Sequence, residues 1–475
     1  MTDLASIAND RFGLGATPQT RVPSDVRGWL DAQLDAFDPS PADMPQLIPT
    51  ADLITTIVDA RARERNARQG SDMAAQEEAR DNRRENTRID RRNLFQASAG
   101  RLQVATRSET PFAERLVHFW SNHFAVSAER LPVRSLAADY EFSAIRRNIK
   151  GNFADLLRAA VGHPAMLLFL DQARSAGPNS PLISRINNRR RNAQLGLNEN
   201  LAREVLELHT LGVRSGYTQD DVVELARALT GWTVAGLLPN RLRRFVDGSP
   251  GETVFIDELH EPGARTILGN RYPANGQQQA VDILNDLAMH PATARHLATK
   301  LARHFIADTP PESPIARLER AYLDSGGELS AVYAALIDAP EVWSDPRTKF
   351  RTPWDWVVAT TRTLGPQSIP RNAQALARLM EMLGQPVWYP GNPSGWGDLA
   401  SDWASPGALL SRVEIANRLT TNGAGNRAGR ADPRSLAEAV LGDALQPSTA
   451  QAVARAEAPG MGIALLLSSP EFMRR

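Results

Sequence analysis

The sequence contains no cysteine. A disulfide framework, a thiolate metal site and a cysteine nucleophile are therefore excluded. This absence is compatible with either a reducing or an oxidising compartment. The sequence also lacks an excess of charge of either sign, because 54 basic residues balance 54 acidic ones. The net charge of the chain therefore gives no reason to expect binding to nucleic acid or to an anionic membrane.

Long apolar runs and several well-known catalytic motifs are absent as well. No stretch approaches the roughly 18 uninterrupted apolar residues of a membrane-spanning helix. Residues 1–15 lack a basic start followed by a long apolar run, so no secretory signal is visible and cytoplasmic residence is expected. No Gly-x-Ser-x-Gly elbow or P-loop occurs, which disfavours a serine hydrolase and a nucleotide hydrolase.

The 475 residues are 42% hydrophobic, which is enough to bury a large core. Helical periodicity dominates, so we expect a mainly α, multi-helix body with one small β-hairpin element and a loop rich in Trp, Pro and Gly. We divide the chain into N-terminal helices over 1–57, a charged helix or mobile arm over 58–100, and a main helical domain over 101–475. The arm has mixed charges, which indicates a solvated helix face, with a partner surface as the alternative.

The stretch 197–232 is the most informative part of the sequence, because polar groups sit there inside an apolar helical pattern. At roughly 100° per residue, Glu204 points between Leu208 and Leu211, on the apolar side of a helix. Glu207 lies along one edge of that face and His209 on the far edge. A carboxylate among apolar side chains needs a proton, a cation or hydrogen bonds. An Arg or a helix terminus could satisfy Glu204 structurally; a metal or a catalytic role is the functional alternative.

The same stretch continues into a second helix. Thr218 and Asp221 fit an N-cap and its third-position acid, and the apolar residues up to Trp232 share one face. The pair resembles a helix-turn-helix, but the exposed face of its second helix is acidic at Asp220, Asp221 and Glu224. Because DNA recognition requires basic residues there, we reject DNA binding.

A further helix begins at Pro111 and carries two histidines. His118 lies on its polar side and His123 on its apolar side, so the two diverge instead of forming a pair that shares one metal. Each is either a hydrogen-bonded core residue or a ligand or acid/base group. His260 is a third histidine to test, on a loop between the β-branched runs 252–256 and 265–269, which predict a hairpin or small strand pair.

Trp388, Trp396 and Trp403 lie in a long loop over 385–403 among Pro and Gly residues. Aromatic side chains of this kind stack on a sugar or another flat ligand, or simply pack over the helices. We name these three residues as candidates for ligand stacking.

Several motifs follow one another in a fixed order along the sequence: Arg11–Pro18, His118–Phe124, Leu197–Gly212, Tyr217–Gln219, Ala226–Trp232, Gly384–Pro390 and Gly395–Gly397. Together these blocks resemble the signature of the bacterial family known as domain of unknown function 1800. The resemblance spans most of the chain and implies no established reaction. Members of this family often look exported and are often encoded beside a protein that resembles twin-arginine-exported proteins. The resemblance therefore offers a co-encoded exported protein as a partner, with periplasmic residence by co-export as the alternative to the cytoplasm.

Two hypotheses follow from these observations. In the first, the protein is an enzyme with a carboxylate/histidine pocket, covered by the Trp-rich loop, that serves acid–base or metal-assisted chemistry. Its candidate catalytic residues are Glu204, Glu207, His118, His123 and His209. A divalent metal is a candidate cofactor, with no ligand set assigned. In the second hypothesis, the same polar groups form a buried network in a non-catalytic binding or assembly protein.

Overall fold

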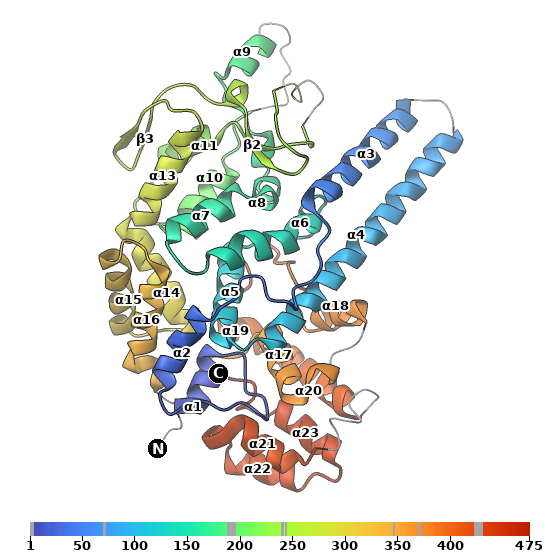
Figure 1. Cartoon of the computed structure of the whole chain (residues 1–475), viewed down its shortest axis with the longest axis vertical. Coiled ribbons are helices and arrows are strands. Elements are labelled where there is room, and N and C mark those ends of the chain that lie inside the picture. The colour runs from blue at the N-terminus through green and yellow to red at the C-terminus, as the bar shows by residue number, and fades with distance from the viewer. Residues whose placement is uncertain are drawn as a thin grey trace.

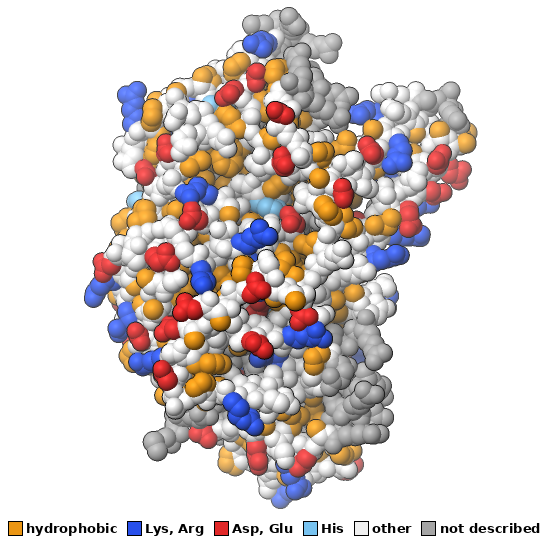
Figure 2. All heavy atoms as spheres, in the orientation of Figure 1, with side chains coloured by type: hydrophobic (Ala, Val, Ile, Leu, Met, Phe, Trp, Pro, Cys, Tyr) orange, Lys and Arg blue, Asp and Glu red, His pale blue; other side chains and the backbone are white. Residues whose placement is uncertain are grey.

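The computed structural model describes the chain except for residues 1–3, 70–72, 188–195, 239–241, 243–244, 345–346, 369–371 and 422–430. The described residues form a mainly α body with two small antiparallel sheets, which confirms the predicted fold class (Figure 1). Within the described part of the chain, every helix is too short or too polar to cross a bilayer. On the face that Figure 2 shows, acidic and basic side chains are interspersed, as the balanced composition predicts.

The first half of the chain begins with short helices and a long helical hairpin. These are α1 (Leu4–Ile7), η1 (Ala8–Phe12), α2 (Val26–Asp35), α3 (Thr50–Gln69) and α4 (Met73–Arg107). Helices α3 and α4 pack side by side and project from the body in Figure 1. The charged segment 58–100 thus lies in these two helices, while residues 70–72 between them lie outside the described residues. The three-part division of the chain stays a prediction.

The middle of the chain contains most of the short helices. They are α5 (Pro111–His123), α6 (Val133–Asp139), η2 (Tyr140–Ile145), η3 (Arg146–Asn148), α7 (Phe153–Gly162), α8 (Pro164–Phe169), η4 (Gln172–Arg174), α9 (Pro181–Asn187), α10 (Asn200–Glu204), η5 (Val205–His209) and α11 (Gln219–Leu229). Of these, η2 and η5 are π-helical, as is η1. The predicted capping box opens α11: the Thr218 hydroxyl accepts from the backbone N–H of Asp221, whose carboxylate accepts from the N–H of Thr218.

Both predicted β-branched runs form strands, but they do not pair with each other. Strand β2 (Thr253–Phe255) pairs with β1 (Trp232–Val234), and β3 (Arg265–Ile267) pairs with β4 (Asn270–Tyr272). The short helix η6 (Asp257–Leu259) lies between β2 and β3. Because a tight two-residue connection joins β3 to β4, that local pairing forms in place of the longer-range one.

Helices fill the rest of the chain. They are α13 (Gln277–Met289), α14 (Pro291–Phe305), α15 (Glu312–Asp324), α16 (Leu329–Asp338), η7 (Pro340–Trp343), α17 (Pro353–Leu364), η8 (Pro366–Ser368), α18 (Ala373–Met382), α19 (Ala400–Trp403), α20 (Pro406–Thr421), α21 (Pro433–Leu441), η11 (Gly442–Ala444), α22 (Pro447–Ala454) and α23 (Pro459–Leu467). One large apolar core runs from Phe12 to Met473 and joins all these regions, with α5 and α17 near its centre (Figure 1).

Candidate functional site

A cavity of about 370 Å³ lies between α5, α14, the first turn of α17 and the loop 385–398. This volume is near the lower end of the range for small-molecule sites. Charged, imidazole and indole side chains all line it. These walls come from four segments that are far apart in the sequence, so the cavity exists only in the folded chain.

Helix α5 supplies one wall. Pro111 opens this helix, and its apolar face packs into the core through residues such as Phe112, Leu116 and Trp120. The remaining face brings Arg115 and His118 to the cavity. The predicted helix, and the assignment of His118 to its more polar side, thus agree with the structure.

His118 is held between an indole and a carboxylate. Its Nδ1 accepts a hydrogen bond from Trp354 Nε1 at 3.3 Å, so the ring proton lies on Nε2, which is 3.7 Å from a carboxylate oxygen of Glu114. Burial, aided by the nearby Arg101, lowers the pKa of His118 well below its ordinary value. The neutral ring therefore orients Trp354, and its Nδ1 is not available to take a proton from a ligand.

Helix α14 supplies the opposite wall. His296, Lys300 and His304 recur at four-residue spacing and therefore share one face, which lines the cavity, while Leu297 and Leu301 pack into the core. The helix begins at Pro291, after His290 caps it by accepting from the N–H of Ala292. His296 Nε2 donates to the backbone oxygen of Leu208 at 3.1 Å.

Lys300 and Arg303 differ from the other cations of the cavity. Neither forms a hydrogen bond or an ion pair with any residue that the structure describes, and the Nε of Arg303 is buried without a partner. Burial lowers the pKa of Lys300 to about 8; Asp398 opposes this shift, and Arg303 adds to it. Among the described residues, these two cationic groups thus face the cavity without a hydrogen-bonded or ion-paired carboxylate.

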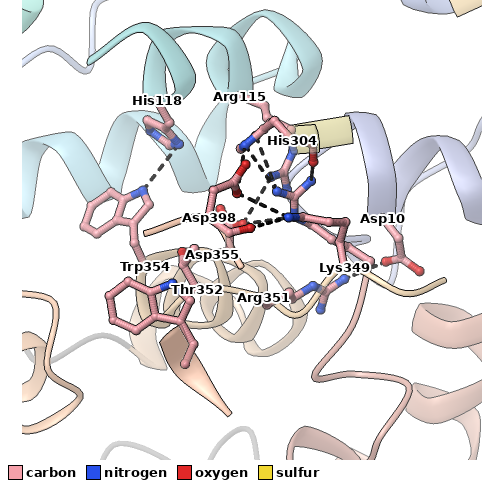
Figure 3. Close-up of polar contacts among 12 residues, drawn as sticks. Asp10, Arg115, His118, His304, Lys349, Arg351, Thr352, Trp354, Asp355 and Asp398 are labelled. Carbon is pink, nitrogen blue, oxygen red and sulfur yellow. Dashed lines mark hydrogen bonds and ion pairs between the residues drawn. The ribbon is translucent and has the colours of Figure 1, made fainter. Parts of the chain in front are cut away.

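The two carboxylates that line the cavity are already compensated. Asp355 lies 3.2 Å from Arg115 and 3.2 Å from Arg475. Asp398 lies 3.4 Å from His304 Nδ1 and 3.5 Å from Lys349. Figure 3 shows both carboxylates turned toward these cationic and imidazole groups.

The ion pairs determine the charge of both carboxylates. Burial alone would raise the pKa of Asp355, but Arg115 and Arg475 outweigh it, and the pKa is lowered well below its ordinary value. The pKa of Asp398 is also lowered, because the hydrogen bond from His304 and the charges of Lys349 and Arg475 outweigh the effect of burial. Both groups are therefore ionised at neutral pH.

The Trp-rich loop forms one wall of the cavity, and two of its indoles line it. These are Trp388, whose Nε1 donates to Glu141 at 2.8 Å, and Trp396, whose backbone N–H donates to Asn122 Oδ1 at 2.7 Å. Trp403 lies outside the lining and packs against Trp396, with ring centroids 5.9 Å apart. The third stacking candidate therefore supports the loop instead of facing the cavity.

Gly395 permits the close approach of this loop to α5. Its φ is +80°, and a Cβ at this position would overlap the backbone oxygen of Asn122. Only glycine combines this backbone conformation with such a contact. The loop is thus seated on α5 by a contact that has no room for a side chain.

The five predicted catalytic residues do not meet at one point. His118 and His123 line the cavity, and His209 lies behind His123 with ring centroids 6.1 Å apart. Glu204 and Glu207 are half-buried and lie outside the lining. Burial, with the neighbouring Glu207, raises the pKa of Glu204.

The reason for the position of His209 is a change in helix type. The predicted helix is α-helical only over α10 and continues as the π-helix η5. A π-turn holds more residues than an α-turn, so side chains after Glu204 rotate away from the expected register. His209 is consequently fully buried, and neither of its ring nitrogens has a hydrogen-bond partner among the described residues.

His260 also lies away from the cavity. Its Nδ1 donates to the backbone oxygen of Thr230 at 2.9 Å, which ties the loop after β2 to the end of α11. This hydrogen bond gives His260, the third histidine, a structural role.

Sequence reasoning missed Lys300, Arg303, His304, Asp355 and Asp398. The four-residue spacing of His296, Lys300 and His304 is a signal in the sequence that could have found one wall. Regarding a metal, no three His, Asp or Glu side chains in the described ranges converge so that they could hold an ion.

Comparisons with known proteins give one match. A family model described as "Protein of unknown function (DUF1800)" matches residues 7–474. No curated protein and no solved structure matches the chain.

Proposed function

This chain belongs to the family described as "Protein of unknown function (DUF1800)", and we propose that it is an enzyme whose substrate is a small organic anion. The substrate binds in the cavity between α5, α14, α17 and the loop 385–398. Trp388 and Trp396 contact its apolar part.

The observation that carries this proposal is the pair of uncompensated cations, Lys300 and Arg303. A half-buried charge without a partner is unfavourable, and an anion between the two groups removes the penalty. The other two cations of the lining are engaged, since Arg115 pairs with Asp355 and Arg101 lies 2.6 Å from Glu141. An anionic group therefore binds at the α14 wall.

The catalytic part of the proposal rests on the groups beside this anion site. The imidazole of His304, with Asp398 at 3.4 Å, is a carboxylate/histidine pair that lines the cavity, and Lys300 lies one turn before it. Burial and Arg475 lower the pKa of His304 to about 4, so the ring is neutral near pH 7, where most of Lys300 is protonated. The ring donates from Nδ1 to Asp398, and its Nε2 lies 3.4 Å from Nη2 of Arg475, so the ammonium of Lys300 is the group of this set that is placed to give a proton to the substrate.

The proposal keeps the carboxylate/histidine chemistry expected from the sequence and changes its residues. Asp398 and His304 take the place of Glu204, Glu207 and His209. In the alternative, the polar groups have a purely structural role. Small anions would then leave the melting temperature unchanged.

Thermal unfolding in the presence of small anions tests the proposal. Acetate and phosphate should raise the melting temperature by roughly 1–3 °C near saturation, whereas the neutral isostere acetamide should not. The variants Lys300→Met and Arg303→Gln should lose this response. A matched control is Arg295→Gln, since Arg295 is on the same helix but ion-paired with Glu312 at the surface. Glu204→Gln, outside the cavity, should also keep the response.

An anion response that is equal in the wild type and in both cavity variants would contradict the proposal. So would stabilisation by acetamide as large as that by acetate.

A further inference from the structure

Lysine is rare in this chain. Only three of the 54 basic residues are lysines, namely Lys150, Lys300 and Lys349, and the others are arginines. Lys150 donates to the backbone oxygen of Leu34 at 2.5 Å, and Lys349 lies 2.7 Å from Asp308. Lys300 is thus the one lysine without a hydrogen bond or ion pair to a described residue, and it is the one that lines the cavity.

The choice of lysine at position 300 indicates chemistry beyond anion binding. An arginine binds a carboxylate or phosphate with two parallel hydrogen bonds, which a lysine cannot do. A lysine, unlike an arginine, can lose its proton near neutral pH and become a nucleophile. The chain uses arginine for almost all of its other basic residues. A lysine amine in the cavity therefore indicates that the lone pair of its neutral form takes part in the chemistry.

Resting on the proposed function, we propose that Lys300 forms an imine with a small aldehyde or ketone whose acidic group is held by Arg303. The acidic group is a carboxylate or a phosphate, since a guanidinium one turn away on the same helix binds either. The cavity of about 370 Å³ restricts the compound to a small one.

The reaction needs no oxidant or reductant. The neutral amine of Lys300 attacks the carbonyl carbon and forms a C–N bond, while the carbonyl π pair moves to oxygen, which takes a proton. The C–O bond of this carbinolamine then breaks, and the oxygen leaves as water after taking a second proton. The nitrogen loses one N–H proton as the carbinolamine forms. Its lone pair then forms the C=N bond, and the nitrogen loses its second N–H proton. These two protons balance the two that the oxygen takes, so one amine and one carbonyl give one imine and one water.

The surroundings of Lys300 favour this reaction. Phe119, Trp354 and Trp388 line the cavity and give it aromatic walls, against which the apolar part of a small carbonyl compound can pack. Burial lowers the pKa of Lys300 to about 8. About a tenth of the side chain is then the neutral amine at pH 7.

Reductive trapping tests the inference on the full chain. The protein is incubated with cyanoborohydride and one of three probes: pyruvate for the carboxylate class, dihydroxyacetone phosphate for the phosphate class, and acetone as a neutral ketone. Intact mass shows the adduct, and peptide mapping places it. We expect one adduct, on Lys300, with at least one acidic probe and much less with acetone. Lys150, Lys349 and the N-terminal amine serve as internal controls.

Two variants extend the test. Lys300→Arg keeps the charge and should give no adduct, while Arg303→Gln keeps the amine and should lower labelling by the acidic probes to the acetone level. Labelling of Lys300 in the wild type should rise with pH through the titration of its amine, near pH 8 in the free protein, whereas labelling of a lysine with the ordinary pKa of 10.5 would continue to rise well above that pH.

The following outcomes overturn the inference: no adduct with either acidic probe, labelling spread equally over the three lysines, or equal labelling by acetone. All three outcomes are read from the intact mass and peptide map of the wild-type protein. The test therefore does not depend on whether the variants fold well. If the thermal response to acetate persists while trapping fails, the imine is wrong and the anion site stands; loss of both rejects both.

Discussion

Lys300 and Arg303 lie one turn apart on α14 and face a cavity whose two carboxylates, Asp355 and Asp398, are engaged elsewhere. In the part of the chain that the structure describes, neither cation thus has an ion-paired carboxylate, and the net effect of the surroundings is to disfavour the charge of Lys300. In the absence of a ligand, Lys300→Met should therefore stabilise the protein at pH 7, by roughly 1–3 kcal/mol. Urea unfolding in a buffer without small anions measures this change.

The pH dependence of this effect has a definite sign. The folded-state pKa of Lys300 is lowered to about 8 from an ordinary value of 10.5, so its charge is unfavourable below pH 8 and the penalty fades as pH rises toward 10.5. The advantage of the Met variant should therefore shrink between pH 8 and pH 10.5. A variant less stable than wild type at pH 7 would show that Lys300 has a partner.

Asp355→Asn tests the ion-pair network in the wall of the cavity. The substitution leaves Arg115 and Arg475 buried without their carboxylate, so the free energy of unfolding should fall by about 3–5 kcal/mol. Asp338→Asn is the control, because the 3.7 Å pair of Asp338 with Arg27 is exposed; it should change stability by about 0.5 kcal/mol or less. Similar effects of the two variants would mean that the buried network contributes little.

His209→Phe tests the buried imidazole behind the cavity. Burial lowers the pKa of His209 to about 3, so the unfolded chain takes up a proton between pH 6.5 and pH 3 that the folded chain does not, and stability falls over that window. The Phe ring has no proton to gain and leaves no hydrogen bond unmade. The variant should therefore lose less stability than wild type between pH 6.5 and pH 4, measured by urea titrations. If the free energy of unfolding changed with pH by the same amount in the variant and in the wild type, the burial of a neutral His209 ring would be contradicted.

Gly395→Ala tests the seating of the Trp-rich loop. A Cβ would overlap the backbone oxygen of Asn122, so the loop should move off α5 and the anion response should weaken, while helical circular dichroism stays unchanged. Gly407→Ala is the matched control, since a Cβ at residue 407 meets nothing within 4 Å. A full anion response in the Gly395→Ala variant would show that the loop does not complete the site.

The local elements of this fold could be predicted from the sequence. Helices α5 and α11 follow from Pro at the first turn, from the Thr218/Asp221 capping box and from apolar residues at helical spacing. These signals act over a few residues, so they do not depend on the rest of the chain. The mainly α class follows from them.

The site itself could be predicted only in part. His118, His123, Trp388 and Trp396 were expected and line the cavity. His209 does not line the cavity, because it ends a π-helix that breaks the assumed periodicity, and Glu204 also lies outside the lining. Asp355 and its partner Arg115 are 240 residues apart in the sequence, and no local pattern reports such a pairing.

The titration of Lys300 itself tests the central claim most directly. Since the chain has three lysines, labelling with ε-¹³C lysine gives three signals, and Lys300→Arg identifies the one from the cavity. We expect that signal to titrate near pH 8 and to move to higher pH when acetate is added, because a bound anion favours the ammonium form. If no lysine signal titrates below about pH 10, or if acetate leaves the titration of Lys300 unchanged, the cavity is not an anion site.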